Sequence, residues 1–174
     1  MSDIKFVKYS LDYEDDLKQF VDLVILEQND PNVSSFKDHF YENLYENKEF
    51  ILWLCLGKDN KIIGTTAARE FRSDYYKKVF KIDPEKYSFN NTKELCSDFI
   101  APVLRGNHFQ YSSILFREKK LQTNYKYAAA TILDTNTYSI NNYLQSGYKI
   151  ISEGSSTWSN IKVTKKFVLL IKEI

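Results

Sequence analysis

Two short stretches of this chain combine the end of a strand, a turn and the start of a helix. They are "IAPVLRGNHFQYSS" at residues 100–113 and "LDTNTYSINNY" at residues 133–143. A strand that leads directly into a helix presents unpaired backbone N–H groups and a partial positive charge, and both suit an anionic ligand. In the first stretch, Arg105 adds a full charge and Gly106 allows a close approach to the backbone. We therefore expect an anion site at residues 100–113.

Strands and helices on both sides of these stretches must position them. An alternating strand at 4–10 precedes a helix that Asp12 is expected to cap, and a second helix starts at 34 or 35 and ends near 46. A Gly-Lys-Asp-Asn turn joins two apolar runs within residues 50–71, which is typical of an antiparallel hairpin. The first helix places Leu17, Phe20, Val21, Val24 and Ile25 on one apolar face.

The second half of the chain repeats strand and helix. We predict a strand at 93–104, a helix at 106–122, a strand at 126–135 and two last strands at 148–152 and 166–174. A short helix begins at Asn136 or Thr135 as its cap and ends before Gly147 in the C′ position. This order predicts an α/β fold with a mixed sheet and helices on both faces.

Composition indicates one domain, 1–174, without a strong preference for charged partners. The 24 basic and 23 acidic residues give a net charge of +1, so no global field favours nucleic acid or an anionic membrane. Neither a signal peptide nor an apolar run of about 20 residues is visible, which predicts a cytoplasmic protein without a membrane span. Cys55 and Cys96 lack metal-ligand or redox spacing, so we expect no metal.

A polar, aromatic insertion separates the third and fourth predicted strands. Residues 72–91, "RSDYYKKVFKIDPEKYSFNN", contain breakers at Pro84 and Asn90–Asn91. Insertions of roughly this length in compact domains are often functional. The alternatives are a lid or platform for a substrate, a contact through which the chain would form a homodimer, and a solvated excursion.

The element order and two segments resemble the GNAT superfamily of acetyl-coenzyme-A-dependent N-acyltransferases. "FIAPVLRGNHFQYSSILF" is similar to the family's pyrophosphate loop, and "ILDTNTYSINNYLQSGYKII" is similar to its later strand–Asn–helix–Gly pattern. Asn136, Tyr143, Gly147 and Tyr148 match that second pattern at the usual spacing. The first segment departs from the family, because His108 stands where a glycine is expected and Gln110 where a small residue is expected.

The resemblance implies a fold and a set of roles. It implies a mostly antiparallel mixed sheet of about seven strands, splayed between the fourth and fifth, with the donor's pantetheine arm between those strands. Backbone amides near Phe99 and Ile100 would bind this arm. The N–H groups that would hold the pyrophosphate belong to Leu104, Arg105, Gly106, Asn107, His108, Phe109 and Gln110. Small residues at 128–130 would leave room for the donor.

Acetyl transfer to an amine requires a base and an acid. Glu94 and Asp98 are the candidate bases, and their spacing of four along a strand predicts that they share a face. The resemblance makes Tyr143 the acid that protonates the leaving thiolate, whereas the structural alternative packs its ring beneath the fifth strand. Asn136 is a helix cap that could also touch the donor. His108 is a surface residue, a phosphate contact or a general base.

Three functions remain open from the sequence. The first is an N-acetyltransferase that uses acetyl-coenzyme A and a small-molecule or peptide amine. The second uses a longer acyl chain on coenzyme A or on acyl carrier protein. The third is a non-catalytic binding module, because bulk at 108 and 110 would narrow the approach of a diphosphate to the backbone.

Overall fold

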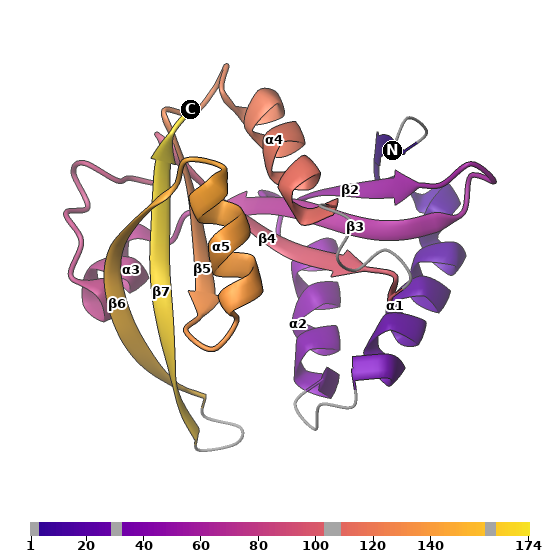
Figure 1. Ribbon diagram of the computed structural model, residues 1–174, viewed down its shortest axis with the longest axis horizontal. Coiled ribbons are helices and arrows are strands. Elements are labelled where there is room, and N and C mark those ends of the chain that lie inside the picture. Colours follow the sequence, from indigo (N-terminus) through magenta and orange to yellow (C-terminus); the bar gives the residue numbers. More distant parts are fainter. Residues whose placement is uncertain (1–3, 29–32, 103–108, 159–162) are drawn as a thin grey trace. The chain divides into compact units, whose positions relative to one another are not determined.

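A seven-stranded mixed sheet organises the chain, in the order β1-β2-β3-β4-β5-β7-β6. The computed structural model describes residues 4–28, 33–102, 109–158 and 163–174 (Figure 1). The strands are β1 (Lys5–Lys8), β2 (Ile51–Leu56), β3 (Ile62–Glu70), β4 (Thr92–Ile100), β5 (Tyr127–Leu133), β6 (Lys149–Trp158) and β7 (Val163–Glu173). β4 and β5 pair in parallel, whereas β1–β2, β2–β3, β5–β7 and β7–β6 are antiparallel. The predicted mixed, mostly antiparallel sheet is therefore confirmed.

The described helices occupy the connections between these strands. They are the 3-10 turn η1 (Leu11–Tyr13), α1 (Glu14–Gln28), α2 (Val33–Glu46), α3 (Ser73–Phe80), α4 (Phe109–Leu121) and α5 (Thr137–Gln145). Glycine 147 has a φ of 90° and lies two residues beyond α5, so its predicted C′ position is confirmed. The predicted Asp12 cap is wrong, because a 3-10 turn that begins at Leu11 precedes α1.

The described residues form two compact units, and strands β3 and β4 contribute to both. The first unit comprises Met1–Ala68 and Ser97–Phe109, and the second comprises Arg69–Cys96 and Gln110–Ile174. In the first unit, α1 buries Leu17, Phe20, Val21 and Val24, as the helical spacing predicts. Ile25, the fifth residue of that predicted face, lies where side chains are not described.

The second unit is built on the antiparallel strands β5, β7 and β6. In Figure 1, α5 lies in front of β5, while α3 lies behind β6. A Cβ added at Gly154 of β6 would stand 2.7 Å from the carbonyl oxygen of Val79 on α3. Glycine at this position therefore allows the helix and the strand to approach closely.

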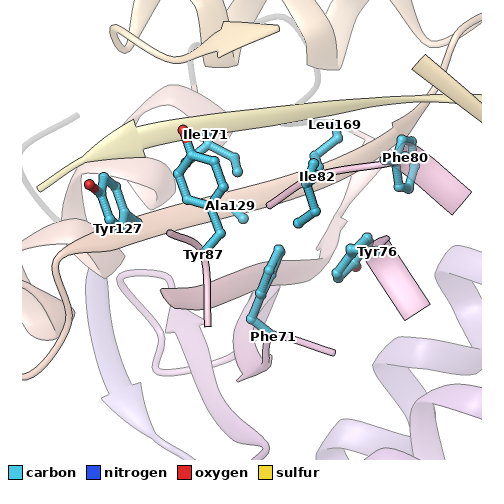
Figure 2. Close-up of a cluster of buried hydrophobic side chains, with 9 residues drawn as sticks. All are labelled: Phe71, Tyr76, Phe80, Ile82, Tyr87, Tyr127, Ala129, Leu169 and Ile171. Atoms are coloured by element: carbon cyan, nitrogen blue, oxygen red, sulfur yellow. The ribbon is translucent and has the colours of Figure 1, made fainter. Parts of the chain in front are cut away.

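The insertion at 72–91 forms part of a hydrophobic core, and its helix α3 is missing from the prediction. Four of its side chains, those of Tyr76, Phe80, Ile82 and Tyr87, belong to a buried cluster (Figure 2). The other members are Phe71, Tyr127, Ala129, Leu169 and Ile171. The solvated alternative is therefore wrong for these four side chains.

Candidate active site

The parallel pairing of β4 with β5 is short. Its register joins Thr92 to Tyr127, Lys93 to Ala128 and Glu94 to Ala129. Beyond these three pairs, β4 continues to Ile100 and β5 continues to Leu133 while remaining paired with β7. The strands therefore part after Glu94, as the predicted splay requires. At this point β5 carries small side chains at Ala128, Ala129 and Ala130, and all three are buried.

Glu94, one of the two predicted bases, is buried in an ion pair. Only 2% of Glu94 is exposed, and Arg69 of β3 donates from Nε to Oε2 at 2.8 Å and from Nη2 to Oε1 at 3.0 Å. Burial raises the pKa of Glu94, but the charge and hydrogen bonds of Arg69, assisted by Tyr76, outweigh that effect and lower it. This arrangement holds Glu94 as a carboxylate with a weak affinity for protons.

Tyr76 completes this cluster from α3. Its hydroxyl oxygen accepts a hydrogen bond from Oγ1 of Thr131 on β5 at 3.0 Å, and it also interacts with the carboxylate of Glu94. Burial and the neighbouring Glu94 raise the pKa of Tyr76 well above its ordinary value. We call Arg69, Tyr76, Glu94 and Thr131 the Arg69 cluster.

Asp98, the second predicted base, belongs to the first unit. It is half-buried, and its Oδ1 accepts a hydrogen bond from Oγ1 of Thr66 on β3. Between the two carboxylates, Ser97 has a φ of 54°, and its carbonyl accepts from Oγ1 of Thr65 at 3.2 Å. A residue in this conformation interrupts the alternation of an extended strand, so spacing alone does not place Glu94 and Asp98 on one face.

Tyr143 is buried beneath α4, with 2% of its surface exposed. Arg117 of α4 is fully buried, and its Nη2 lies 3.4 Å from the hydroxyl oxygen of Tyr143. The Nη1 of the same guanidinium donates to the carbonyl of Cys96 at 3.3 Å. Cys96 lies on β4, two residues beyond the last residue that pairs with β5. Arg117 thus links the phenol to the point where the two strands part.

Two further groups hold this arrangement in place. Ser113, one turn earlier on α4, accepts from Arg117 at its carbonyl (3.3 Å to Nε) and at its hydroxyl (3.4 Å to Nη2). The ring of Tyr148 meets that of Tyr143 edge to face at 4.8 Å. We call Ser113, Arg117, Tyr143 and the carbonyl of Cys96 the Arg117 cluster.

The side chain of Gln110 is hydrogen-bonded to α5. Its Oε1 accepts from Nδ2 of Asn142 at 2.9 Å, and its Nε2 donates to Oγ of Ser139 at 2.9 Å. Only 7% of Gln110 is exposed. The residue that departs from the family pattern at 110 therefore joins the N-terminus of α4 to α5, the helix that carries Tyr143.

The remaining predicted donor-binding residues are distributed as follows. Asn136 caps α5, because its Oδ1 accepts from the backbone N–H of Ser139 at 3.1 Å. Phe99 packs its ring edge to face on Phe40 of α2 at 5.3 Å, and Ile100 ends β4 half-buried. Phe109 is buried at the start of α4. Leu104, Arg105, Gly106, Asn107 and His108 lie outside the described residues.

Arg117 is the residue that the sequence analysis missed. The predicted helical face of α4 runs through Ile114 and Leu121, and position 117 lies between them at helical spacing. A charged residue at a position that the pattern assigns to the core is the signal that could have identified it. Among the described residues, no group of His, Cys, Asp and Glu could hold a metal ion. No described helix is long and apolar enough to cross a membrane.

Comparison with known proteins identifies the fold. No protein-family model matches the sequence. The search of curated proteins also finds no match. Solved structures match over nearly the whole chain.

NAA60 of Arabidopsis thaliana in complex with acetyl-CoA is 11% identical, with a TM-score of 0.70, and the match covers 98% of both chains. An acetyltransferase of the GNAT family from Streptococcus pneumoniae is 15% identical, with a TM-score of 0.68, covering 98% of this chain and 99% of that one. The Microcin C7 self immunity acetyltransferase MccE, in complex with acetyl-CoA and AMP, is 15% identical, with a TM-score of 0.67, covering 100% of this chain and 94% of that one. The chain therefore has the fold of GNAT acetyltransferases.

Proposed function

We propose that this chain, which has the GNAT fold, is an N-acetyltransferase that moves an acetyl group from acetyl-coenzyme A to an amine of a small molecule or peptide. The observation that carries the proposal lies in the second unit. The pairing of β4 with β5 stops at Glu94, and Arg117 holds the buried hydroxyl of Tyr143 next to the β4 backbone at Cys96. Acetyl-CoA is present in the solved complexes of NAA60 and MccE, which share the fold.

The parting strands suit the pantetheine arm of the donor. Its amides can take the hydrogen bonds that a neighbouring strand would otherwise supply. The side chains of Ala128 and Ala130 on β5 are small. In this proposal the backbone amides of Phe99 and Ile100 bind the arm. The N–H groups at 104–110 bind the pyrophosphate with Arg105, where the start of a helix favours an anion.

The reaction is a direct attack. The neutral amine nitrogen forms a bond to the thioester carbonyl carbon, and the bond from that carbon to sulfur breaks. The nitrogen gives its extra proton to a base, directly or through water, and Tyr143 gives its hydroxyl proton to the departing sulfur. Of the two predicted bases we favour Asp98, because Arg69 already neutralises Glu94 and lowers its pKa.

Gln110 supports retention of donor binding. The sequence alone suggests that its bulk obstructs the diphosphate, but its side-chain amide is hydrogen-bonded to Ser139 and Asn142 on α5. The departure at 110 is therefore compatible with a donor at the preceding loop. This finding weakens the part of the argument for the non-catalytic alternative that concerns position 110.

The test begins with donor binding. Thermal melting with acetyl-coenzyme A at a hundred times its Kd should show a stabilisation of about 2.7 kcal/mol. No shift at millimolar donor would contradict the proposal. Turnover is then measured as thiol release over a panel of amines. If medium-chain acyl donors react faster than acetyl-coenzyme A, the transferred group is a longer acyl chain and not acetyl.

A variant pair identifies the acid. Tyr143→Phe should lower kcat on the order of 10²-fold, while donor affinity is retained. Tyr138→Phe is the matched control, because Tyr138 lies on the same helix and is 51% exposed. Equal turnover in the two variants would remove Tyr143 from the mechanism.

A further inference from the structure

We propose that Arg117 is a positioning residue for Tyr143, which fixes the direction in which the phenol gives its proton and favours its ionisation during transfer. The inference rests on the proposed function, since it assigns a role within that same site. It is carried by the Arg117 cluster.

The direction follows from the chemistry of the guanidinium group. An arginine side chain has five N–H donors and no acceptor. In the contact between Nη2 of Arg117 and the hydroxyl of Tyr143, the phenol oxygen must therefore accept. The phenol therefore does not use its own proton for this contact. In the proposed reaction this proton is given to the departing sulfur.

The position follows from the rest of the same guanidinium. Ser113 holds the Nε side from the preceding turn of α4, while Nη1 donates to the carbonyl of Cys96 on β4. Because the guanidinium group is planar, hydrogen bonds at Nε and Nη1 also fix the position of Nη2. Arg117 therefore sets the place of the phenol oxygen relative to β4, immediately beyond the end of its pairing with β5.

The charge of Arg117 has a second consequence. When Tyr143 gives up its proton, negative charge develops on the phenol oxygen, and a buried cation nearby stabilises that charge strongly. Among the described residues, other charged or titratable groups around this site include the thiol of Cys96 on β4, Tyr148, Glu118 on α4 and Lys172 on β7. Burial, Tyr143 and Glu118 raise the pKa of Tyr148 well above its ordinary value, so Tyr148 stays neutral. Lys172 donates to Oε2 of Glu118 at 2.7 Å, which leaves that pair balanced.

The first experiment is a kinetic cycle. Arg117→Met should lower kcat about 10-fold to 100-fold with little change in the KM for acetyl-coenzyme A. The double variant with Tyr143→Phe should be no slower than Tyr143→Phe alone, because Arg117 acts through Tyr143. Lys119→Met is the matched control, since it removes an exposed charge from the same helix. Independent losses that multiply in the double variant would overturn the proposal.

The second experiment reads ionisation without turnover. Tyrosine labelled with ¹³C at Cζ reports the phenolate directly, and the Tyr143→Phe variant assigns its resonance. The midpoint of ionisation of Tyr143 should move to higher pH in Arg117→Met, and less far in Arg117→Lys, which keeps the charge. An unchanged midpoint in both variants would overturn the proposal.

These experiments separate the two levels of the argument. If the wild-type chain neither binds acetyl-coenzyme A nor releases thiol, the proposed function fails, while the titration still decides whether Arg117 controls Tyr143. If Arg117→Met does not fold, Arg117→Lys and Arg117→Gln take its place, with melting temperature as the check on folding. Wild-type kcat in a folded variant that lacks the charge would overturn the role of Arg117.

Discussion

The second unit contains two buried clusters that each pair an arginine with a tyrosine, and they arrange their protons in opposite ways. In the Arg69 cluster, the cation is neutralised by Glu94, and the hydroxyl of Tyr76 interacts with that carboxylate. In the Arg117 cluster, the described hydrogen bonds of the guanidinium reach neutral oxygens, including that of Tyr143. The two clusters therefore contain the same residue types but differ in the charge of the groups around the arginine.

This difference is the basis on which we propose a structural role for Tyr76 and a chemical role for Tyr143. Tyr76 lies beside an anion, which raises its pKa and makes it a poor acid. Tyr143 lies beside a cation, which favours the loss of a proton. In a chain with 13 tyrosines, the partner of the hydroxyl is therefore more informative than the residue type.

The largest expected effect is the loss of stability when the arginine of each cluster is replaced. Arg69→Met should destabilise the fold by about 3–5 kcal/mol, because it leaves the buried carboxylate of Glu94 without its cation. Arg117→Met should cost less, about 1–3 kcal/mol, because it leaves neutral groups unsatisfied. Urea unfolding of both variants measures the difference. Equal losses would show that the two clusters are electrostatically alike.

Acid should weaken the Arg69 cluster selectively. The folded pKa of Glu94 is lowered, so this carboxylate stabilises the fold fully above its unfolded pKa of about 4.3. That stabilisation is lost as the pH falls from there through the folded pKa. Relative to Glu94→Gln, the wild-type advantage in unfolding free energy should be constant near neutral pH and shrink below about pH 4. An advantage independent of pH would assign the effect to packing instead of charge.

Removing the hydroxyl of Tyr76 should cost more stability than removing that of Tyr143. Tyr76→Phe should cost about 1.5–3 kcal/mol of stability, because it deletes an interaction with a buried anion and leaves the hydroxyl of Thr131 without this partner. Tyr143→Phe should cost less than about 1 kcal/mol, since its contact with Arg117 is long at 3.4 Å. Tyr75→Phe, on the same helix as Tyr76, is the control. A greater stability loss at Tyr143 than at Tyr76 would reverse the assignment of roles.

Local patterns predict much of this fold because they report burial directly. The spacing of Leu17, Val21 and Val24 predicts the buried face of α1, and Gly147 marks the end of α5. The insertion is different: its breakers indicate a loop, yet Tyr76 and Phe80 form a core with residues of β5 and β7. That core depends on contacts between residues far apart in sequence, and the local spacing of apolar residues does not reveal such contacts.

The candidate site shows the same limit. The match at Asn136 and Tyr143 locates α5, but the hydrogen bonds of Gln110 reach across 29 and 32 residues to Ser139 and Asn142. The sequence therefore presents Gln110 as bulk beside the donor loop rather than as a link between helices. Likewise, the ion pair of Glu94 with Arg69 joins two neighbouring strands across 25 residues of sequence, whereas strand spacing alone suggests a base.

The smallest expected effect concerns the helix that carries Tyr143. Asn136→Ala removes the side-chain acceptor that caps α5, and the loss of such a cap typically costs about 1 kcal/mol. Asn141→Ala, at an exposed position on the same helix, leaves that cap in place and serves as the control. If Asn136 is only a cap, the affinity for acetyl-coenzyme A should be unchanged in both variants at a temperature well below their melting points. If Asn136 also contacts the donor, Asn136→Ala alone should weaken donor binding. Calorimetric titration with acetyl-coenzyme A decides between these outcomes, because it separates loss of helix stability from loss of a ligand contact.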